Sequence, residues 1–238
     1  MTKARCLTYG IKKEAQIMAR NIHLSLEGTE FQFISPQGQA VIKTSLVGIY
    51  NVYNILGVIA AALARGIRLE TIQEGIEDLK GVPGRLERVD CGQKFSSFID
   101  YAHTQDALEN VLKTLREVSR SKIILLFGCG GNRDKTKRPL MAGAAEKWAD
   151  YCVVTSDNPR KEDPQEIIDD IVPGFERDRY RVIVDRREAM GYALSSAREG
   201  DILLIAGKGH EDYQILKDKT IPFKEKEIIE GYFQCLAR

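Results

Sequence analysis

Four short segments of the sequence combine charged side chains, histidine and glycine in a way that suits ligand binding. They are Asp100-Tyr-Ala-His-Thr104, Gly128-Cys-Gly-Gly-Asn-Arg-Asp-Lys-Thr-Lys-Arg138, Ser156-Asp-Asn-Pro-Arg160 and Gly207-Lys-Gly-His-Glu211. Arginine and lysine bind carboxylates or phosphates, and arginine does so through two parallel hydrogen bonds. Aspartate and glutamate bind ammonium groups, while glycine lets backbone amides come close to a ligand. Together the segments suit a zwitterion, such as an amino acid, beside a phosphate-bearing partner.

The charged side chains that we expect to face this ligand are Arg133, Lys137, Arg138, Arg160 and Lys208 as cations and Asp100, Asp157 and Glu211 as anions. Each segment taken alone also has a plainer interpretation. A glycine-rich loop is often only a tight turn, His103 and His210 suit the surface or the core equally well, and a run of basic residues suits a solvated face. The glycine spacing after residue 127 does not fit a dinucleotide-binding loop, and glycine follows Lys208 where a Walker loop needs serine or threonine.

Each segment follows a short apolar run of the kind that forms strands. The runs in this half of the chain are Phe98-Ile99, Ile123 to Phe127, Cys152 to Thr155, Arg181 to Val184 and Ile202 to Ala206. Several are apolar without alternation, which is typical of strands covered on both faces. If these strands are parallel, their carboxyl ends share one edge, and the four loops that follow them face one crevice. A shared site is therefore the better interpretation of the four segments.

Amphipathic helices are predicted between the strands. Residues 106–118 place their leucines and valines on one face, and Pro139 suits the first position of a helix that ends at Trp148. Asp163 and Asp185 are each followed three residues later by glutamate, a pattern typical of helix starts. The alternation of strands and helices predicts an α/β domain with a doubly wound, mostly parallel, Rossmann-like sheet.

The first 80 residues show a different pattern. Period-2 alternation predicts a small antiparallel sheet from three segments, at residues 21–26, 29–34 and 40–46, with a turn at Pro36-Gln-Gly38. Two helices follow, from about Asn51 to Gly66 and from Leu69 to Leu79. Asn51 could serve only as a helix cap, whereas Asn54 has no such explanation. Gly81-Val-Pro-Gly84 is the predicted domain boundary.

Composition excludes several classes of function. The net charge of +1 over 238 residues gives no broad field for nucleic acid or an anionic membrane. No apolar run approaches the roughly 20 residues that a membrane helix needs, and the amino terminus lacks a signal-peptide core. The five cysteines include no CxxC pair, which argues against a disulfide framework and a structural zinc site. We expect a cytoplasmic protein.

Several motifs, in their order along the chain, resemble those of the Mur ligase family. They are Asn51-Val-Tyr-Asn54, Gly84-Arg-Leu-Glu87, Asp100-Tyr-Ala-His103 and Gly207-Lys-Gly-His-Glu211, supported by Gly128 to Asp134 and Lys137-Arg-Pro139. Asp157-Asn-Pro-Arg160 is similar to the signature of the members that add meso-diaminopimelate. The resemblance covers essentially the whole chain.

The resemblance implies an ATP-dependent amide ligase of peptidoglycan synthesis that uses ATP with Mg²⁺. Its substrates would be meso-diaminopimelate and UDP-N-acetylmuramoyl-L-alanyl-D-glutamate, whose carboxylate is activated as an acyl phosphate. Residues 1–82 would be the carboxy-terminal portion of the central ATPase domain, and residues 83–238 the domain that binds the incoming amino acid. The family's glycine-rich ATP loop and metal-bridging lysine are expected before Met1, in an N-terminal half of the same enzyme. We therefore assign no catalytic residue and no metal ligand, and expect no activity from the chain alone.

By the same resemblance, two groups of residues have expected roles. The nucleotide would be surrounded by Asn51, Asn54, Arg85, Asp100, His103 and Lys137. Diaminopimelate would be bound by Arg133, Asp157, Asn158, Arg160, Gly207 and Glu211. Arg160 suits the distal carboxylate of diaminopimelate, which lysine lacks. Gln105 stands where the family usually has proline, and we expect a looser loop there.

Two alternatives remain open at this point. The α/β domain could act as a stand-alone module that binds an amino acid. The chain could also belong to a related amide ligase, such as a folylpolyglutamate synthase, although Asp157-Asn-Pro-Arg160 has no role in that family.

Overall fold

The computed structural model describes residues 6–236, which form two compact units. One comprises the chain up to Val82 together with Glu117–Ser119, and the other comprises the remainder from Pro83. Among the described residues, no helix combines the length and the apolar character needed to cross a membrane.

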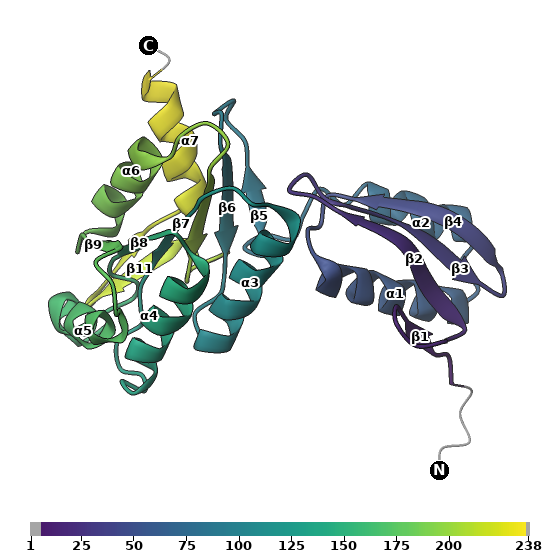
Figure 1. Ribbon diagram of the computed structural model, residues 1–238, viewed down its shortest axis with the longest axis horizontal. Coiled ribbons are helices and arrows are strands. Elements are labelled where there is room, and N and C mark those ends of the chain that lie inside the picture. Colours follow the sequence, from purple (N-terminus) through teal and green to yellow (C-terminus); the bar gives the residue numbers. More distant parts are fainter. Residues whose placement is uncertain (1–5, 237–238) are drawn as a thin grey trace. The chain divides into compact units, whose positions relative to one another are not determined.

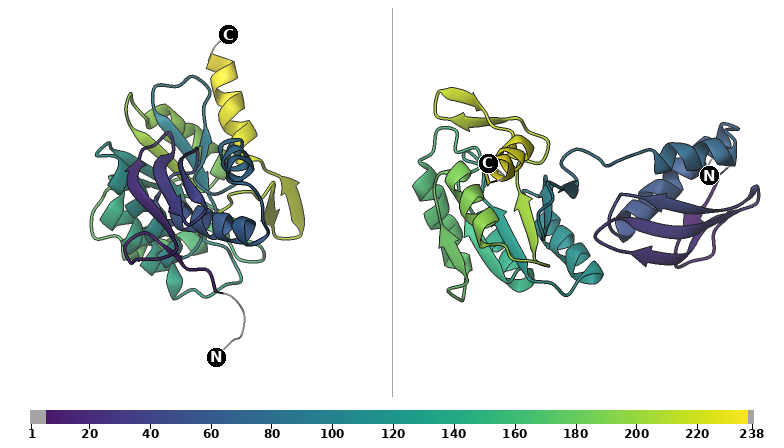
Figure 2. Two further views of the ribbon diagram at one scale, coloured as in Figure 1. Left: turned by 90° about the vertical axis from the view of Figure 1, so that its right-hand side faces the viewer. Right: turned by 90° about the horizontal axis from the view of Figure 1, so that it is seen from above.

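The first unit is a four-stranded sheet with two helices against one face (Figures 1 and 2). Its strands, in spatial order, are β1 (Tyr9–Gly10), β2 (Ile17–Leu24), β3 (Thr29–Ser35) and β4 (Gly38–Thr44). The antiparallel pairing of β2, β3 and β4 confirms the prediction, whereas β1 pairs parallel to β2 and was not expected. Phe31 and Phe33 pack against Leu56 and Ile59 in the core.

The helices of this unit are α1 (Ile49–Ala64) and α2 (Leu69–Glu77). The residue before α1 is Gly48, whose φ of 100° suits glycine, so the interpretation of Asn51 as a helix cap is wrong. Asn51 lies buried inside the helix, where its Nδ2 donates to the Val47 carbonyl at 2.9 Å. The Asn54 side chain in turn donates to Asn51 Oδ1 at 3.3 Å.

The second unit is built on a six-stranded sheet in the order β5-β6-β10-β7-β8-β9 (Figure 1). Its strands are β5 (Glu87–Val89), β6 (Ser96–Asp100), β7 (Ile123–Phe127), β8 (Tyr151–Val154), β9 (Tyr180–Val182) and β10 (Ile202–Ala206). All neighbours pair in parallel except β5, which runs antiparallel to β6 and was not predicted. Every residue of β7 and β10 is buried, as their unbroken apolar runs indicated.

Helices cover both faces of this sheet, which confirms the doubly wound prediction (Figure 1). They are α3 (Gln105–Val118), α4 (Lys137–Trp148), α5 (Pro164–Ile171) with the short 3-10 helix η1 (Val172–Gly174), α6 (Arg186–Ser196) and α7 (Glu225–Leu236). Ala189 and Ala193 of α6 pack on Leu126 and Leu203. A hairpin of β11 (Tyr213–Leu216) and β12 (Lys219–Pro222) stands apart from the large sheet (Figure 2).

Local sequence signals set the starts of α5 and α6 in this unit. Asp163 and Asp185 cap α5 and α6 as predicted, since their side chains accept from Gln165 N at 2.8 Å and Glu188 N at 2.9 Å. The predicted start of α4 at Pro139 is wrong, because the helix begins at Lys137. Proline is tolerated two positions further in because N–H groups throughout the first turn have no partner within the helix.

Candidate functional site

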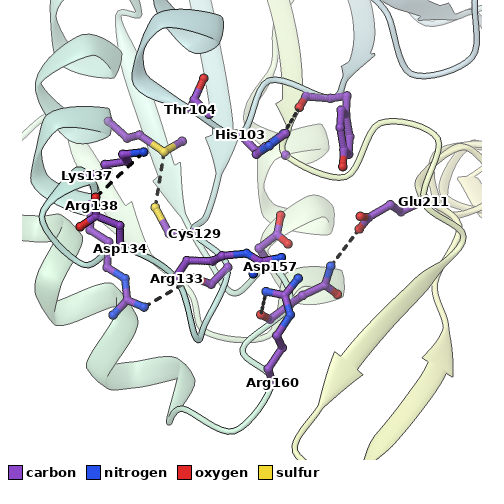
Figure 3. A pocket seen from close by; sticks show the side chains of 15 residues that line it. His103, Thr104, Cys129, Arg133, Asp134, Lys137, Arg138, Asp157, Arg160 and Glu211 are labelled. Carbon is purple, nitrogen blue, oxygen red and sulfur yellow. Dashed lines mark hydrogen bonds and ion pairs between the residues drawn. The ribbon is translucent and has the colours of Figure 1, made fainter.

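A pocket of about 330 Å³ lies at the carboxyl ends of β6, β7, β8 and β10 (Figure 3). It is lined by Tyr101, His103, Thr104, Cys129, Gly130, Arg133, Asp134, Lys137, Arg138, Met141, Asp157, Asn158, Arg160, Gly207 and Glu211. All four loops singled out in the sequence contribute to this list, which confirms that they face one crevice. The parallel pairing of the strands is the reason, because it brings the four strand ends to one edge.

The residues expected to bind diaminopimelate all line this pocket: Arg133, Asp157, Asn158, Arg160, Gly207 and Glu211. Of those expected near a nucleotide, His103 and Lys137 line it as well, whereas Arg85 and Asp100 do not. Asn51 and Asn54 belong to the first unit, and their role near a nucleotide stays a prediction.

Close packing between neighbouring loops explains why glycine is needed at positions 131 and 207. A Cβ at Gly131 would lie 1.9 Å from the Pro159 carbonyl oxygen, and one at Gly207 would lie 2.5 Å from Asp157 Oδ2. Gly207 also has a φ of 117°, which side chains rarely adopt. These glycines therefore allow one loop to pack against another. This role is separate from the predicted one, in which glycine lets backbone amides come close to a ligand.

One side of the pocket is fixed by hydrogen bonds among buried polar side chains. We call Asp157, Asn158 and Glu211 the inner wall; Lys208 lies fully buried behind it. Asn158 Nδ2 donates to Glu211 Oε2 at 2.8 Å, and Lys208 Nζ donates to Asn158 Oδ1 at 3.0 Å and to Glu211 Oε2 at 3.3 Å. Asp157 Oδ2 is buried and has no hydrogen-bond partner among the described residues.

Arg160 is held in place beside the inner wall through its backbone and its side chain. Its Nη1 donates to the Gly131 carbonyl at 2.9 Å, and its amide donates to the Ile215 carbonyl at 3.1 Å. Its own carbonyl accepts from Lys217 N at 2.6 Å. The β11–β12 hairpin and the glycine-rich loop therefore place this guanidinium in the pocket from two directions.

A buried ion pair lies behind the inner wall. Arg186 and Glu225 are almost completely buried, and Arg186 Nε donates to Glu225 Oε1 at 2.8 Å. The same guanidinium donates to the Ala206 carbonyl at 2.8 Å and the Ser156 carbonyl at 3.3 Å. These carbonyls directly precede Gly207 and Asp157, so one side chain links the two loops that carry the inner wall. Burial raises the pKa of Glu225, although Arg186 opposes this shift.

The opposite side of the pocket is more open. We call His103, Arg133 and Lys137 the outer edge. His103 Nδ1 lies 2.8 Å from the Tyr101 carbonyl oxygen; since a carbonyl only accepts, Nδ1 carries the proton and the other ring nitrogen is left for a ligand. Lys137 is 63% exposed and lies 4.0 Å from Asp134, and no side chain within residues 6–236 pairs with Arg133.

Asp100 has a different environment from the one that the sequence suggested. It is buried, and its two carboxylate oxygens accept from Leu86 N at 2.7 Å and Ala102 N at 2.8 Å. Burial raises its pKa, which these two hydrogen bonds and Arg85 oppose. Asp100 thereby holds the segment containing Arg85, whose guanidinium lies 5.5 Å from the centre of the Tyr101 ring.

Four other charged residues are buried and paired within the protein, which the sequence did not predict. Arg138 lines the pocket, as expected, but it is 1% exposed and paired with Asp170 at 2.7 Å and Glu162 at 2.9 Å. Lys208 was also expected to face a ligand, but it is fully buried and donates to Asn158 and Glu211. Arg186 and Glu225 were not singled out, because each stands in a stretch of charged residues that resembles a solvated surface.

Comparison with known proteins gives two matching family models. The model of the Mur ligase glutamate ligase domain matches residues 84–209, and that of the Mur ligase middle domain matches residues 1–62.

Curated relatives agree with these models. The chain is 48% identical over 226 residues to a UDP-N-acetylmuramoyl-L-alanyl-D-glutamate--2,6-diaminopimelate ligase of Syntrophomonas wolfei, with 94% of this chain and 46% of the relative covered. It is 49% identical over 230 residues to the protein of the same name in Geobacillus thermodenitrificans, with 96% and 47% covered. A solved structure of this ligase aligns with a TM-score of 0.74 at 36% identity, covering 98% of this chain and 48% of that one. The chain thus spans about half the length of the relatives that it matches.

Proposed function

We propose that this chain, which belongs to the Mur ligase family, forms the amino-acid-binding part of an ATP-dependent ligase. The substrate that we propose is meso-diaminopimelate, which the ligase would join to UDP-N-acetylmuramoyl-L-alanyl-D-glutamate in peptidoglycan synthesis. The relatives at 48% and 49% identity carry names for this reaction.

The observation that carries the proposal is the presence of Arg160 and the acidic inner wall in one pocket. Diaminopimelate has an ammonium and a carboxylate group at each end. Glu211 and Asp157 suit an ammonium group, and Arg160 suits the carboxylate beside it. Lysine lacks the distal carboxylate, so its binding would leave this arginine without that partner, at a cost of roughly 1–3 kcal/mol.

The outer edge fits a second, phosphate-bearing substrate. Lys137 is an exposed cation, and His103, which lines the same pocket, presents a free ring nitrogen. ATP would supply the phosphoryl group that activates the carboxylate of the uridine nucleotide substrate. We propose that His103 and Lys137 offset the negative charge of its phosphates, while Arg133 keeps the diaminopimelate role expected from the sequence. Arg85 and Asp100 would support the same nucleotide, and the roles predicted for Asn51 and Asn54 near a nucleotide rest on the family resemblance alone.

Magnesium would also be needed to balance the charge of ATP. Within residues 6–236 no group of three or more histidine, cysteine, aspartate or glutamate side chains is placed to hold a metal ion.

Calorimetric titration of the chain with meso-diaminopimelate and with L-lysine tests the proposal. We expect measurable binding of diaminopimelate and an affinity for lysine that is lower by roughly tenfold, from the single unpaired guanidinium. Arg160→Met should remove this preference. Arg179→Met, an exposed arginine that is absent from the pocket lining, is the matched control and should keep it. Equal affinity of the unmodified chain for both amino acids would contradict the proposal.

A further inference from the structure

We propose that Lys208 is a positioning residue that sets the orientation of Asn158 and Glu211 in the pocket. The ligand named in this proposal rests on the function proposed above. Lys208 is completely buried and does not itself line the cavity. Its influence on a bound amino acid would therefore act through the residues that it contacts.

The hydrogen-bonding capacity of lysine determines which way the Asn158 amide faces. An ammonium group can only donate, so the atom 3.0 Å from Lys208 Nζ is the Asn158 oxygen. The Ile215 amide donates to this same oxygen at 3.0 Å. With its oxygen fixed by two donors, the Asn158 nitrogen faces Glu211 Oε2 at 2.8 Å. Turning the amide over would place its NH₂ group against two other donors.

The orientation of Glu211 follows from the same contacts. Its Oε2 accepts from Asn158 Nδ2 and from Lys208 Nζ, at 2.8 Å and 3.3 Å. Within the described part of the chain, no donor reaches Oε1. Because Glu211 lines the pocket, this second oxygen is the one that is free to accept from a ligand's ammonium group. Lys208 thus fixes one oxygen and leaves the other available.

Burying a lysine is unfavourable in itself. Burial lowers the pKa of Lys208, although Asp157 and Glu211 oppose the shift. An apolar side chain would fill this place without desolvating a charge, and it would leave Glu211 with only one of its two donors. The presence of a cation at this position is therefore explained by the orientation of its neighbours better than by packing.

A double-mutant cycle for diaminopimelate binding tests whether Lys208 acts through Glu211. We expect Lys208→Met and Glu211→Gln each to weaken binding roughly tenfold, because each removes a charge-assisted hydrogen bond. The double variant should also bind about tenfold more weakly, since the two changes disrupt one interaction. Losses that multiply to roughly a hundredfold would overturn the proposal.

Two controls separate positioning from general damage. Lys219→Met removes an exposed lysine of the β11–β12 hairpin and should leave the affinity unchanged. If Lys208→Met does not fold, Lys208→Gln, which keeps an uncharged donor, takes its place in the cycle.

A crystal structure of the unliganded Lys208 variant gives a test that needs no ligand. We expect the Glu211 carboxylate or the Asn158 amide to be rotated relative to the unmodified chain. Unchanged orientations of both would overturn the proposal. Failure of the unmodified chain to bind diaminopimelate would instead contradict the proposed function, and the crystallographic result would still decide the role of Lys208.

Discussion

The two sides of the pocket differ in how they are supported. The inner wall packs against the buried Lys208, with the Arg186–Glu225 ion pair behind it, whereas the outer edge extends into solvent through Arg133 and Lys137. Asn158 is 3% exposed and Lys137 is 63% exposed, although both line the same pocket. On the inner wall, interactions within the protein hold Asn158 and Glu211 before any ligand arrives. On the outer edge, Lys137 forms one exposed ion pair, and His103 contacts the carbonyl and the ring of Tyr101.

This difference matches the two tasks that we propose for the pocket. Choosing one amino acid requires groups with fixed positions, because discrimination depends on leaving the wrong ligand with unpaired polar groups. Offsetting the charge of phosphates requires cations nearby and tolerates motion, because electrostatic attraction depends weakly on direction. The contrast predicts that changes behind the inner wall will affect stability strongly and that changes at the outer edge will not.

The largest effect is expected from Arg186→Met. This change leaves the Glu225 carboxylate buried without its partner and removes the donor to the Ala206 and Ser156 carbonyls. Breaking a buried pair in this way costs about 3–5 kcal/mol of unfolding free energy, which urea denaturation followed by circular dichroism will measure. Diaminopimelate binding should weaken as well, because the two loops are no longer linked.

The control for this experiment is an exposed ion pair at the start of α7, the helix that carries Glu225: Lys224 with Glu227 at 2.7 Å. Lys224→Met should change the unfolding free energy by less than about 1 kcal/mol, as is usual for pairs in water. If Arg186→Met cost no more than this control, the inner side of the pocket would not be held by its buried charges.

A smaller loss is expected from Gly207→Ala. The new Cβ would lie 2.5 Å from Asp157 Oδ2, on a backbone with a φ of 117°. We expect a loss of roughly 1–3 kcal/mol from the backbone conformation, with a further loss from displacement of the Asp157 carboxylate. Gly200→Ala is the matched control, because Gly200 has a φ of 83° and no heavy atom within 4 Å of its Cβ position. Equal losses in the two variants, measured by urea denaturation, would show that the contact with Asp157 does not matter.

The strands and the residues that line the pocket were easier to predict from the sequence than the burial of the charged residues that support them. Unbroken apolar runs gave β7 and β10 with their correct bounds, and the caps Asp163 and Asp185 were local signals. The burial of Lys208, Arg138 and Arg186 had no local signal. Each is charged, and tertiary contacts with residues 24 to 50 positions away make its burial tolerable. The hairpin that supports Arg160 was missed for a related reason, since it is a separate two-stranded sheet with little apolar pattern.

The buried charge of Lys208 predicts a particular dependence of stability on pH. Its pKa in the folded chain is lowered by burial from the ordinary value of 10.5. Between the lowered pKa and 10.5, the unfolded chain therefore holds a proton that the folded chain has released, and stability rises with pH. We expect the difference in unfolding free energy between the unmodified chain and Lys208→Met to grow with pH across this window and to level off above 10.5. A difference that stays constant with pH would show that Lys208 is not desolvated.

The smallest effect, and one of opposite sign, is expected at the outer edge from Gln105→Pro. Gln105 is the first residue of α3, and Thr104 before it accepts from Ala107 N through its side chain at 3.3 Å and from Leu108 N through its carbonyl at 2.9 Å. At this position a proline loses no helical hydrogen bond, and its fixed φ suits a helix start. The substitution should therefore raise the unfolding free energy by about 0.4–1 kcal/mol, mainly by restricting the unfolded chain. It should also restrain the neighbouring loop that carries His103, which hydrogen exchange of the 101–104 amides will detect. A destabilised variant would mean that this loop is already held as firmly as the inner wall, and the contrast between the two sides of the pocket would then fail.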